Sequence, residues 1–169
     1  MTTETAASYR MLEQIHDTRR AIRLALEPTF RSSVATAAEP LAASDRIYAT
    51  GSGTSMHAAQ FARYAFWMLA GIEVTPVSTS DLLAVPPLRV PHSPLLVFSQ
   101  SGMSKATVEA AAGAASDRGL VTSIVSVDDT PLTRVAASTL VVPGGRDTAL
   151  AKTKSFTTTM VAVVLLALE

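Results

Sequence analysis

Two short stretches of the sequence gather small hydroxyl side chains around glycine, and these residues are the ones best suited to chemistry. Residues 51–55 (GSGTS) and residues 99–104 (SQSGMS) each lie between an apolar run and a segment with a helical pattern. The first backbone N–H groups of a helix lack partners inside the helix, and the helix dipole makes that end positive. Combined with hydroxyl donors, such a junction suits an anion, and above all a phosphate group.

Three better-known loop motifs do not fit these stretches. A dinucleotide fingerprint needs a third glycine where Met56 stands, and no Walker lysine follows either loop. A nucleophile elbow built on Ser101 needs a glycine at position 99, which is a serine. Helix capping stays open beside an anion cradle, because Ser and Thr also cap helices and seed turns. Capping explains either loop alone at least as well, whereas the two loops together favour a ligand.

The segments around the loops predict an α/β fold. Apolar runs typical of buried strands alternate with helix-length segments, which favours a parallel sheet whose crossover helices cover both faces. We therefore expect a three-layer α/β/α sandwich with a five-stranded parallel sheet. The expected strands are residues 46–50, 73–78, 95–100, 121–127 and 138–143, and the expected helices after the first are residues 54–70, 103–118, 130–137 and 154–169.

The first helix is predicted to be amphipathic and to end near Glu27, before Pro28. Residues 29–45 are polar and rich in alanine, which predicts a connection rather than an element. The apolar stripe, which normally faces the core of a surface helix, consists of Met11, Ile15, Ile22 and Leu26.

Two further segments have distinctive patterns. Residues 54–70 are apolar on nearly every face, so this helix is expected to be covered on several sides, with Gly71 as its left-handed cap. The proline-rich residues 84–94 predict a surface loop.

Composition excludes several classes of protein. The chain has 169 residues, 48% of them hydrophobic and 17% charged, with a formal net charge of zero, which predicts one folded domain without affinity for nucleic acid. It has no cysteine, so disulfides, thiolate metal sites and a cysteine nucleophile are excluded. The N-terminus has no secretory-signal pattern, and the longest apolar run, residues 160–168, is far shorter than the roughly 20 residues of a membrane span. We expect a soluble, cytoplasmic protein without a membrane partner.

Three motifs in a fixed order resemble a known family. GSGTS after the first strand, SQSG after the third and AKTKSFTTT (residues 151–159) near the end resemble the SIS (sugar isomerase) domain of phosphosugar enzymes. The likeness is closest to the first SIS domain of the isomerase half of glucosamine-6-phosphate synthase and to related amino-sugar-phosphate isomerases and deaminases. It covers nearly the whole chain and implies an SIS-type, flavodoxin-like fold.

The resemblance also implies which residues meet the substrate. In the family, the SQSG loop holds the sugar phosphate and the GTS loop adds backbone and hydroxyl contacts. Two departures, Met103 in place of a common glutamate and LAKTK (residues 150–154) in place of VASTK, leave the identity of the sugar open. The implied phosphate and sugar contacts are Ser52, Gly53, Thr54, Ser55, Ser99, Gln100, Ser101 and Ser104.

The length of the chain bears on its organisation. Synthase-like members carry two SIS domains, and their catalytic glutamate, histidine and lysine come from the second half or a neighbouring subunit. By resemblance, residues 1–40 form an N-terminal helical segment and residues 41–169 form the first of two SIS halves of a longer chain. The family implies a homodimer or higher oligomer, and the apolar residues 54–70 and the apolar C-terminal segment are the expected contacts. We expect no cofactor, and the spacing of the three histidines does not suggest a metal site.

A catalytic base is not evident, although sugar isomerisation requires one. Asp147 precedes the last motif but is equally typical of a solvated turn, and His57 is more typical of a surface or packing residue than of an acid for ring opening. Lys152 and Lys154 could approach a substrate, with solvated charges as the default. The other carboxylates at strand ends are Asp81, Asp128 and Asp129, of which the last two suit turns.

Two functions therefore remain open. The first is an aldose-ketose phosphosugar isomerase or amino-sugar-phosphate deaminase/isomerase whose active site is completed by a second SIS domain or a partner subunit. The alternative is a non-catalytic phosphosugar sensor, which the lack of a convincing base favours.

Overall fold

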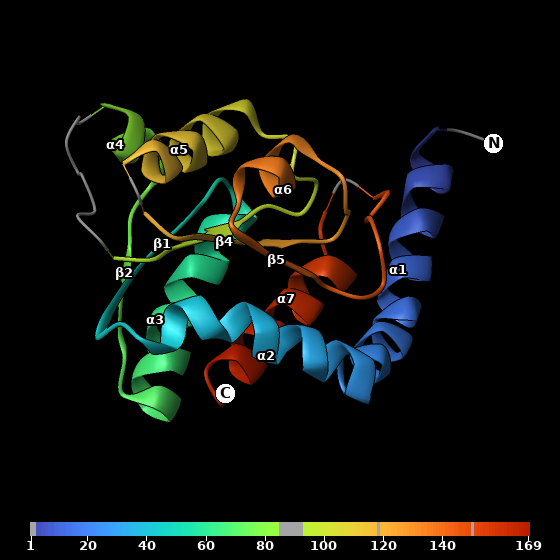
Figure 1. The fold of residues 1–169 in the computed structure, drawn as a ribbon. Coiled ribbons are helices and arrows are strands. Elements are labelled where there is room, and N and C mark those ends of the chain that lie inside the picture. Colours follow the sequence, from blue (N-terminus) through green and yellow to red (C-terminus); the bar gives the residue numbers. More distant parts are fainter. Residues whose placement is uncertain (1–2, 85–92, 118, 150) are drawn as a thin grey trace.

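The computed structural model describes residues 3–84, 93–117, 119–149 and 151–169 and contains one parallel sheet. Its five strands lie in the order β2-β1-β3-β4-β5 (Figure 1). This arrangement confirms the predicted α/β sandwich with five parallel strands. The strands are β1 (Arg46–Gly51), β2 (Glu73–Pro76), β3 (Leu95–Phe98), β4 (Val121–Val125) and β5 (Ser138–Val141).

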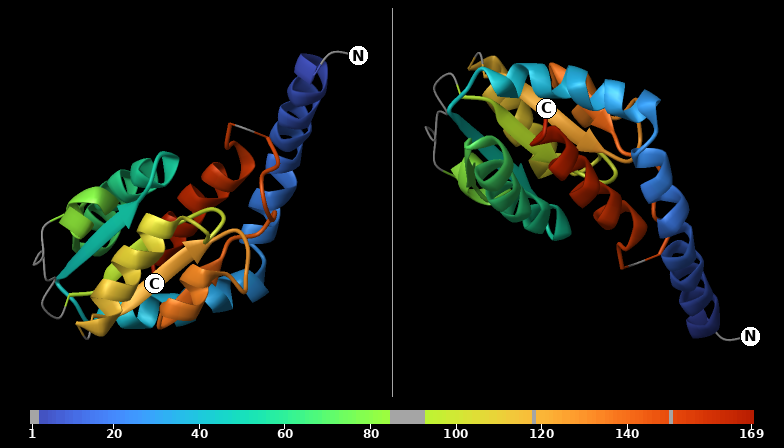
Figure 2. Two further views of the ribbon diagram at one scale, coloured as in Figure 1. Left: turned by 90° about the horizontal axis from the view of Figure 1, so that it is seen from above. Right: turned by 90° about the horizontal axis from the view of Figure 1, so that it is seen from below.

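Helices cover both faces of the sheet (Figures 1 and 2). On one face α2 (Pro28–Ala42), α3 (Thr54–Ala70) and α7 (Lys154–Leu166) share a core cluster with Leu96 and Phe98 of β3. On the other face α5 (Lys105–Ser116) and α6 (Pro131–Val135) pack with Leu95 and Val97 of the same strand. Because successive strand residues point to opposite faces, β3 serves both cores, and all four of its residues are buried.

The predicted elements after residue 45 form close to their expected bounds. Helix α3 ends at Gly71, which has the expected left-handed conformation (φ 71°), and Pro131 occupies the first turn of α6. The C-terminal segment is a helix whose apolar side is buried, as predicted. The short helix α4 (Thr79–Ala84) was not predicted, and most of the expected proline-rich loop, residues 85–92, lies outside the described residues.

The predicted connection at residues 29–45 is wrong, because most of it is helix α2. Pro28 stands at the start of α2, where its missing N–H removes no helical hydrogen bond. Alanines and Pro40 obscure the pattern, although the buried residues follow a helical period: Phe30, Val34, Ala37, Ala38 and Leu41.

The face that the first helix buries also differs from the prediction. Helix α1 (Thr3–Ala25) buries Gln14, Ala21 and Ala25, whereas Met11 and Ile15 of the apolar stripe are 40% and 47% exposed. The N-terminal half of α1 extends past the body of the domain (Figure 2). The helix therefore meets the domain through polar and small side chains.

Helix α3 is covered on one side only, contrary to the expectation from its composition. Its alanines and Phe66 are buried, but Tyr64, Trp67 and Met68 are 64%, 65% and 79% exposed. None of the helices in the described part of the chain is long and apolar enough to cross a membrane.

Candidate functional site

The sheet places the two hydroxyl-rich loops side by side. Strands β1 and β3 are adjacent and parallel, and Gly51 at the end of β1 is in register with Phe98 at the end of β3. Residues 52–55 and residues 99–104 therefore start from the same edge of the sheet, the carboxyl end, where α/β proteins of this class bind ligands.

A pocket with about 300 Å³ of empty space, part of it open to solvent, lies between these loops and the start of α7. A larger space of about 980 Å³ lies beside α3 and β2, but it shares no residue with either loop. The smaller pocket thus has the chemistry expected of an anion site. It is lined by Thr54, Ser55, Ala58, Phe98, Ser99, Gln100, Ile124, Lys152, Ser155, Phe156 and Thr159.

Two glycines allow the loops to pass close to their neighbours. A Cβ on Gly51 would lie 2.7 Å from backbone and side-chain atoms of Ser55, so the turn into α3 requires a glycine there. Gly102 has φ 63°, in the left-handed region, and a Cβ on it would collide with the side chain of Thr130. Each loop therefore contains one glycine that its shape requires.

A chain of hydroxyl groups joins the two loops. Ser52 Oγ lies 3.2 Å from Thr107 Oγ1 of α5, and Thr107 Oγ1 donates to Ser104 Oγ at 3.0 Å. Ser52 therefore donates to Thr107, and on its other side Ser52 Oγ lies 3.4 Å from Thr79 Oγ1. Thr79 and Thr107 are buried, so the chain fixes the first loop against the second from within the domain.

The hydroxyl groups of the second loop also shape its turn. Ser99 Oγ accepts a hydrogen bond from Gly102 N at 3.2 Å, and Ser101 Oγ accepts one from Met103 N at 3.3 Å. Each hydroxyl keeps its own proton for another acceptor.

Helix capping is not the role of these loops. In the described structure the N-cap residue of α3 is Gly53, which has no side chain to cap with, and the side chain of Ser104, the N-cap of α5, forms no capping hydrogen bond. Gln100 Nε2 is buried and has no hydrogen-bond partner among the described residues, which is unusual for a buried amide. This nitrogen is therefore a free donor on a residue that lines the pocket.

The start of α7 forms the third wall of the pocket. Ser155 is almost fully buried, with its hydroxyl donating to Asp147 Oδ2 at 2.7 Å, and Thr159 lies one turn further along. Lys152 is the one ionisable residue among the described residues that line the pocket, and its Nζ donates to the carbonyl oxygens of Ala149 (3.1 Å) and Asp147 (3.4 Å). One of the three Nζ protons remains for a ligand.

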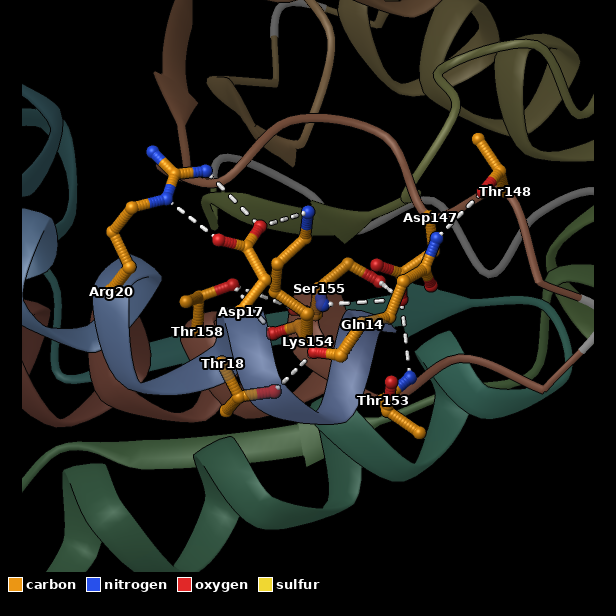
Figure 3. A network of polar contacts seen from close by, with 10 residues as sticks. All are labelled: Gln14, Asp17, Thr18, Arg20, Asp147, Thr148, Thr153, Lys154, Ser155 and Thr158. Atoms are coloured by element: carbon orange, nitrogen blue, oxygen red, sulfur yellow. Dashed lines mark hydrogen bonds and ion pairs between the residues drawn. The ribbon is translucent and has the colours of Figure 1, made fainter. Parts of the chain in front are cut away.

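Asp147 is a buried structural residue, which excludes the solvated turn that the sequence left open as one of two alternatives. It is 2% exposed, and its Oδ2 accepts hydrogen bonds from Thr153 N (3.1 Å), Ser155 N (3.2 Å) and Ser155 Oγ. A carboxylate with these donors orders the entry into α7 (Figure 3).

The remaining base and acid candidates lie in local contacts of their own. Asp129 has φ 52° and pairs with Arg134 at 2.8 Å, and Asp128 Oδ1 accepts from Asp129 N. The exposed His57 has its Nδ1 3.1 Å from Gln60 Oε1, and Asp81 lies in the first turn of α4, where its backbone N donates to Ser78 Oγ. None of these four candidates lines the pocket.

The residues implied by the resemblance divide by position. Thr54, Ser55, Ser99 and Gln100 line the pocket, whereas Ser52 and Ser104 belong to the hydroxyl chain beside it. Ser101 serves the turn, and Gly53 precedes α3 with φ 58°. The sequence interpretation missed Ser155 and Thr159, although their spacing of one helical turn in KSFTTT was a usable signal.

Comparison with known proteins gives consistent matches. The chain is 34% identical over 160 residues to glutamine–fructose-6-phosphate aminotransferase [isomerizing] of Pyrococcus horikoshii, covering 94% of this chain and 27% of that protein. A solved structure from Silicibacter pomeroyi DSS-3, assigned as a phosphosugar isomerase, has a TM-score of 0.83 at 27% identity over 94% of this chain and 49% of that one. For tagatose-6-phosphate ketose/aldose isomerase of Escherichia coli the TM-score is 0.73 and the identity 29%, with 88% and 44% covered.

These matches cover most of this chain but only part of each relative. The chain is matched over most of its length, but it spans only 27% of the aminotransferase and less than half of each of the two solved chains. The SIS domain family itself matches residues 40–169, which include both hydroxyl-rich loops and α7. The fold, the order of the motifs and this match confirm the resemblance seen in the sequence, and the chain belongs to the SIS domain family.

Proposed function

We propose that this chain binds a sugar phosphate, with the phosphate in the pocket between the two loops and α7. The observation that carries the proposal is the convergence of neutral donors and one cation on this pocket: Ser55, Ser99, Gln100 and Lys152. A phosphate dianion accepts hydrogen bonds from such groups, each contributing roughly 1.5–3 kcal/mol before desolvation and ordering are subtracted. The sugar then extends toward the open side of the pocket.

The proposed reaction class is that of the relatives, an aldose-ketose isomerase or an amino-sugar-phosphate deaminase/isomerase. Moving a proton between adjacent carbons needs a base with a tuned pKa. Of the described residues in the pocket lining, Lys152 alone is ionisable, and it is held by two carbonyl groups. We therefore propose that a second SIS domain or a partner subunit supplies the base and the acid, in a cytoplasmic dimer or higher oligomer.

The same observation favours a second candidate function. A pocket that has hydrogen-bond donors but no base can bind a metabolite without converting it, so a phosphosugar sensor is the alternative. In that case binding would change the interaction with a partner, and the substrate would leave the pocket unaltered.

Isothermal calorimetry tests the premise that both functions share. Fructose 6-phosphate and glucosamine 6-phosphate are compared with fructose and glucosamine at the same concentrations. We expect heat of binding from the phosphorylated sugars only, because the donors lie where the phosphate rests. Equal binding of phosphorylated and plain sugars would exclude both functions.

Proton exchange separates the enzyme from the sensor. In heavy water an isomerase exchanges the proton at C2 of an aldose phosphate such as glucosamine 6-phosphate, or a proton at C1 of fructose 6-phosphate, and the deuterium is visible by NMR. We expect exchange from the assembled protein that contains the second half or partner. Binding without exchange in that assembly would select the sensor.

A further inference from the structure

Helix α1 meets the domain through a polar face, which is unusual for a helix that also carries an apolar stripe. Gln14 is 7% exposed, and Asp17 and Thr18 are half-buried beside it, while Met11 and Ile15 are exposed. The side chains of Gln14 and Asp17 point toward Thr148 and Lys154, which lie in the chain on either side of the pocket residue Lys152 (Figure 3). Helix α1 therefore packs against the part of the chain that lines the candidate site.

The main contact is an ion pair between Asp17 and Lys154. Lys154 Nζ lies 2.8 Å from Asp17 Oδ2, and the lysine side chain is only 8% exposed. A buried ammonium group is stable only with a partner, so Asp17 determines where Lys154 lies. The hydrogen bonds from Arg20 and Lys154 lower the pKa of Asp17 from 3.8 to about 2, so the pair is intact at neutral pH.

A second contact lies one helical turn away. Gln14 Oε1 accepts a hydrogen bond from Thr148 Oγ1 at 2.9 Å, and Gln14 Nε2 donates to the neighbouring Asp147 Oδ1 at 3.1 Å. Asp147 in turn binds Thr153 N, Ser155 N and Ser155 Oγ (Figure 3). Lys152 and Ser155, which lie in this part of the chain, line the pocket together with Phe156 and Thr159 of α7.

We propose that Asp17 is a positioning residue for the ligand site: its ion pair with Lys154 fixes the segment of residues 152–155 that presents Lys152 and Ser155. The inference rests on the proposed function, because it assumes that a sugar phosphate occupies this pocket. Lys154 does not line the pocket, so its charge acts on α1 and not on the ligand. Helix α1 is thus a part of the site although it contributes no residue to the pocket lining.

The test compares Asp17→Asn, Asp17→Glu and Arg20→Gln with the parent chain. Asp17→Asn should raise the dissociation constant for fructose 6-phosphate about tenfold, a coupling of ordinary size between neighbouring elements. Asp17→Glu keeps the charge and should restore binding. Arg20→Gln is the matched control, since it removes the exposed partner of the same carboxylate and leaves Lys154 paired.

Hydrogen exchange distinguishes a local loosening of residues 153–155 from a general loss of stability. In Asp17→Asn, the peptide with the Thr153 and Ser155 amides should exchange faster while β3 and β4 stay protected. Unchanged exchange in that peptide, or a tenfold loss in Arg20→Gln as well, would overturn the inference. If the parent chain binds no sugar phosphate, the proposed function fails, and the exchange experiment still decides whether Asp17 orders this segment.

Discussion

Ser52 Oγ and Thr107 Oγ1 lie 3.2 Å apart, and this contact joins the loop after β1 to the helix after β3. The two residues are 55 positions apart in the chain. Thr107 also donates to Ser104, so one buried hydroxyl fixes a residue of each loop. The relative position of the loops, and hence the width of the pocket between them, depends on Thr107.

Thr107→Val should therefore weaken both the domain and the site. The substitution keeps the shape and removes two hydrogen bonds, which should lower the free energy of unfolding by about 1–2 kcal/mol. It should also weaken the binding of fructose 6-phosphate, because the loops lose their link. Urea unfolding and calorimetry measure the two effects.

Thr36→Val is the matched control for that substitution. Thr36 is exposed on α2 and its hydroxyl donates only to Ser32 O within the same helix. This variant should bind the sugar phosphate like the parent chain. If Thr107→Val also binds like the parent, the hydroxyl chain has no part in shaping the pocket.

Gly102→Ala should disrupt the second loop. Alanine at φ 63° is strained, and its Cβ would collide with the side chain of Thr130, so the loop must move. We expect a loss of about 1–3 kcal/mol in the free energy of unfolding together with weaker binding of the sugar phosphate. Thermal unfolding and calorimetry on the same sample check both.

Gly113→Ala is the contrasting variant for that prediction. Gly113 lies inside α5, has no strained φ, and a Cβ on it would meet nothing within 4 Å. The change should raise the free energy of unfolding by roughly 0.5–1 kcal/mol, since alanine favours a helix over glycine. Equal destabilisation by both alanines would show that the conformation of Gly102 is not what matters.

Acid should release the contact between α1 and α7. The folded-state pKa of Asp17 is about 2 and its ordinary value is 3.8, so the ion pair contributes its full stability above about pH 4 and loses it as the pH falls toward 2. The difference in free energy of unfolding between the parent chain and Asp17→Asn should be constant from pH 5 to pH 7 by the same linkage. Urea titrations at each pH measure this difference, in which all other carboxylates cancel. A difference that grows on acidification contradicts the assignment.

Most of the fold could be predicted from the sequence because its local patterns agree with its tertiary structure. The residues of β3 form one apolar run, and Gly71 follows an apolar helix as a left-handed cap. Helix α2 was missed because Pro28 and Pro40 suggest breaks, although one starts the helix and the other lies near its end.

The buried face of α1 could not be predicted from its own residues. Gln14 and Asp17 have their partners 134 and 137 positions away in the chain, at Thr148 and Lys154. Without those partners an apolar stripe is the better indication of a buried face. The two loops of the site were found because their residue types are locally unusual, whereas Ser155 lies in a helix whose pattern is mainly that of a core.

Lys152 gives the pocket its charge, and this has a measurable consequence. Lys152→Met should weaken the binding of fructose 6-phosphate about tenfold, the equivalent of about 1.4 kcal/mol, because one charge-assisted hydrogen bond to the phosphate is lost. Binding to the parent chain should weaken as salt is raised toward about 1 M, where screening is almost complete, and the variant should respond less.

Lys105→Met distinguishes a direct contact between Lys152 and the phosphate from a long-range attraction by positive charge. Lys105 is the first residue of α5, its side chain is 90% exposed, and it does not line the pocket. Both variants lose one positive charge from the same end of the sheet, so a purely long-range attraction would be reduced equally. We expect Lys105→Met to keep the affinity and the salt dependence of the parent chain. Equal losses would mean that Lys152 does not touch the phosphate, and that the neutral donors Ser55, Ser99 and Gln100 hold it without a cation.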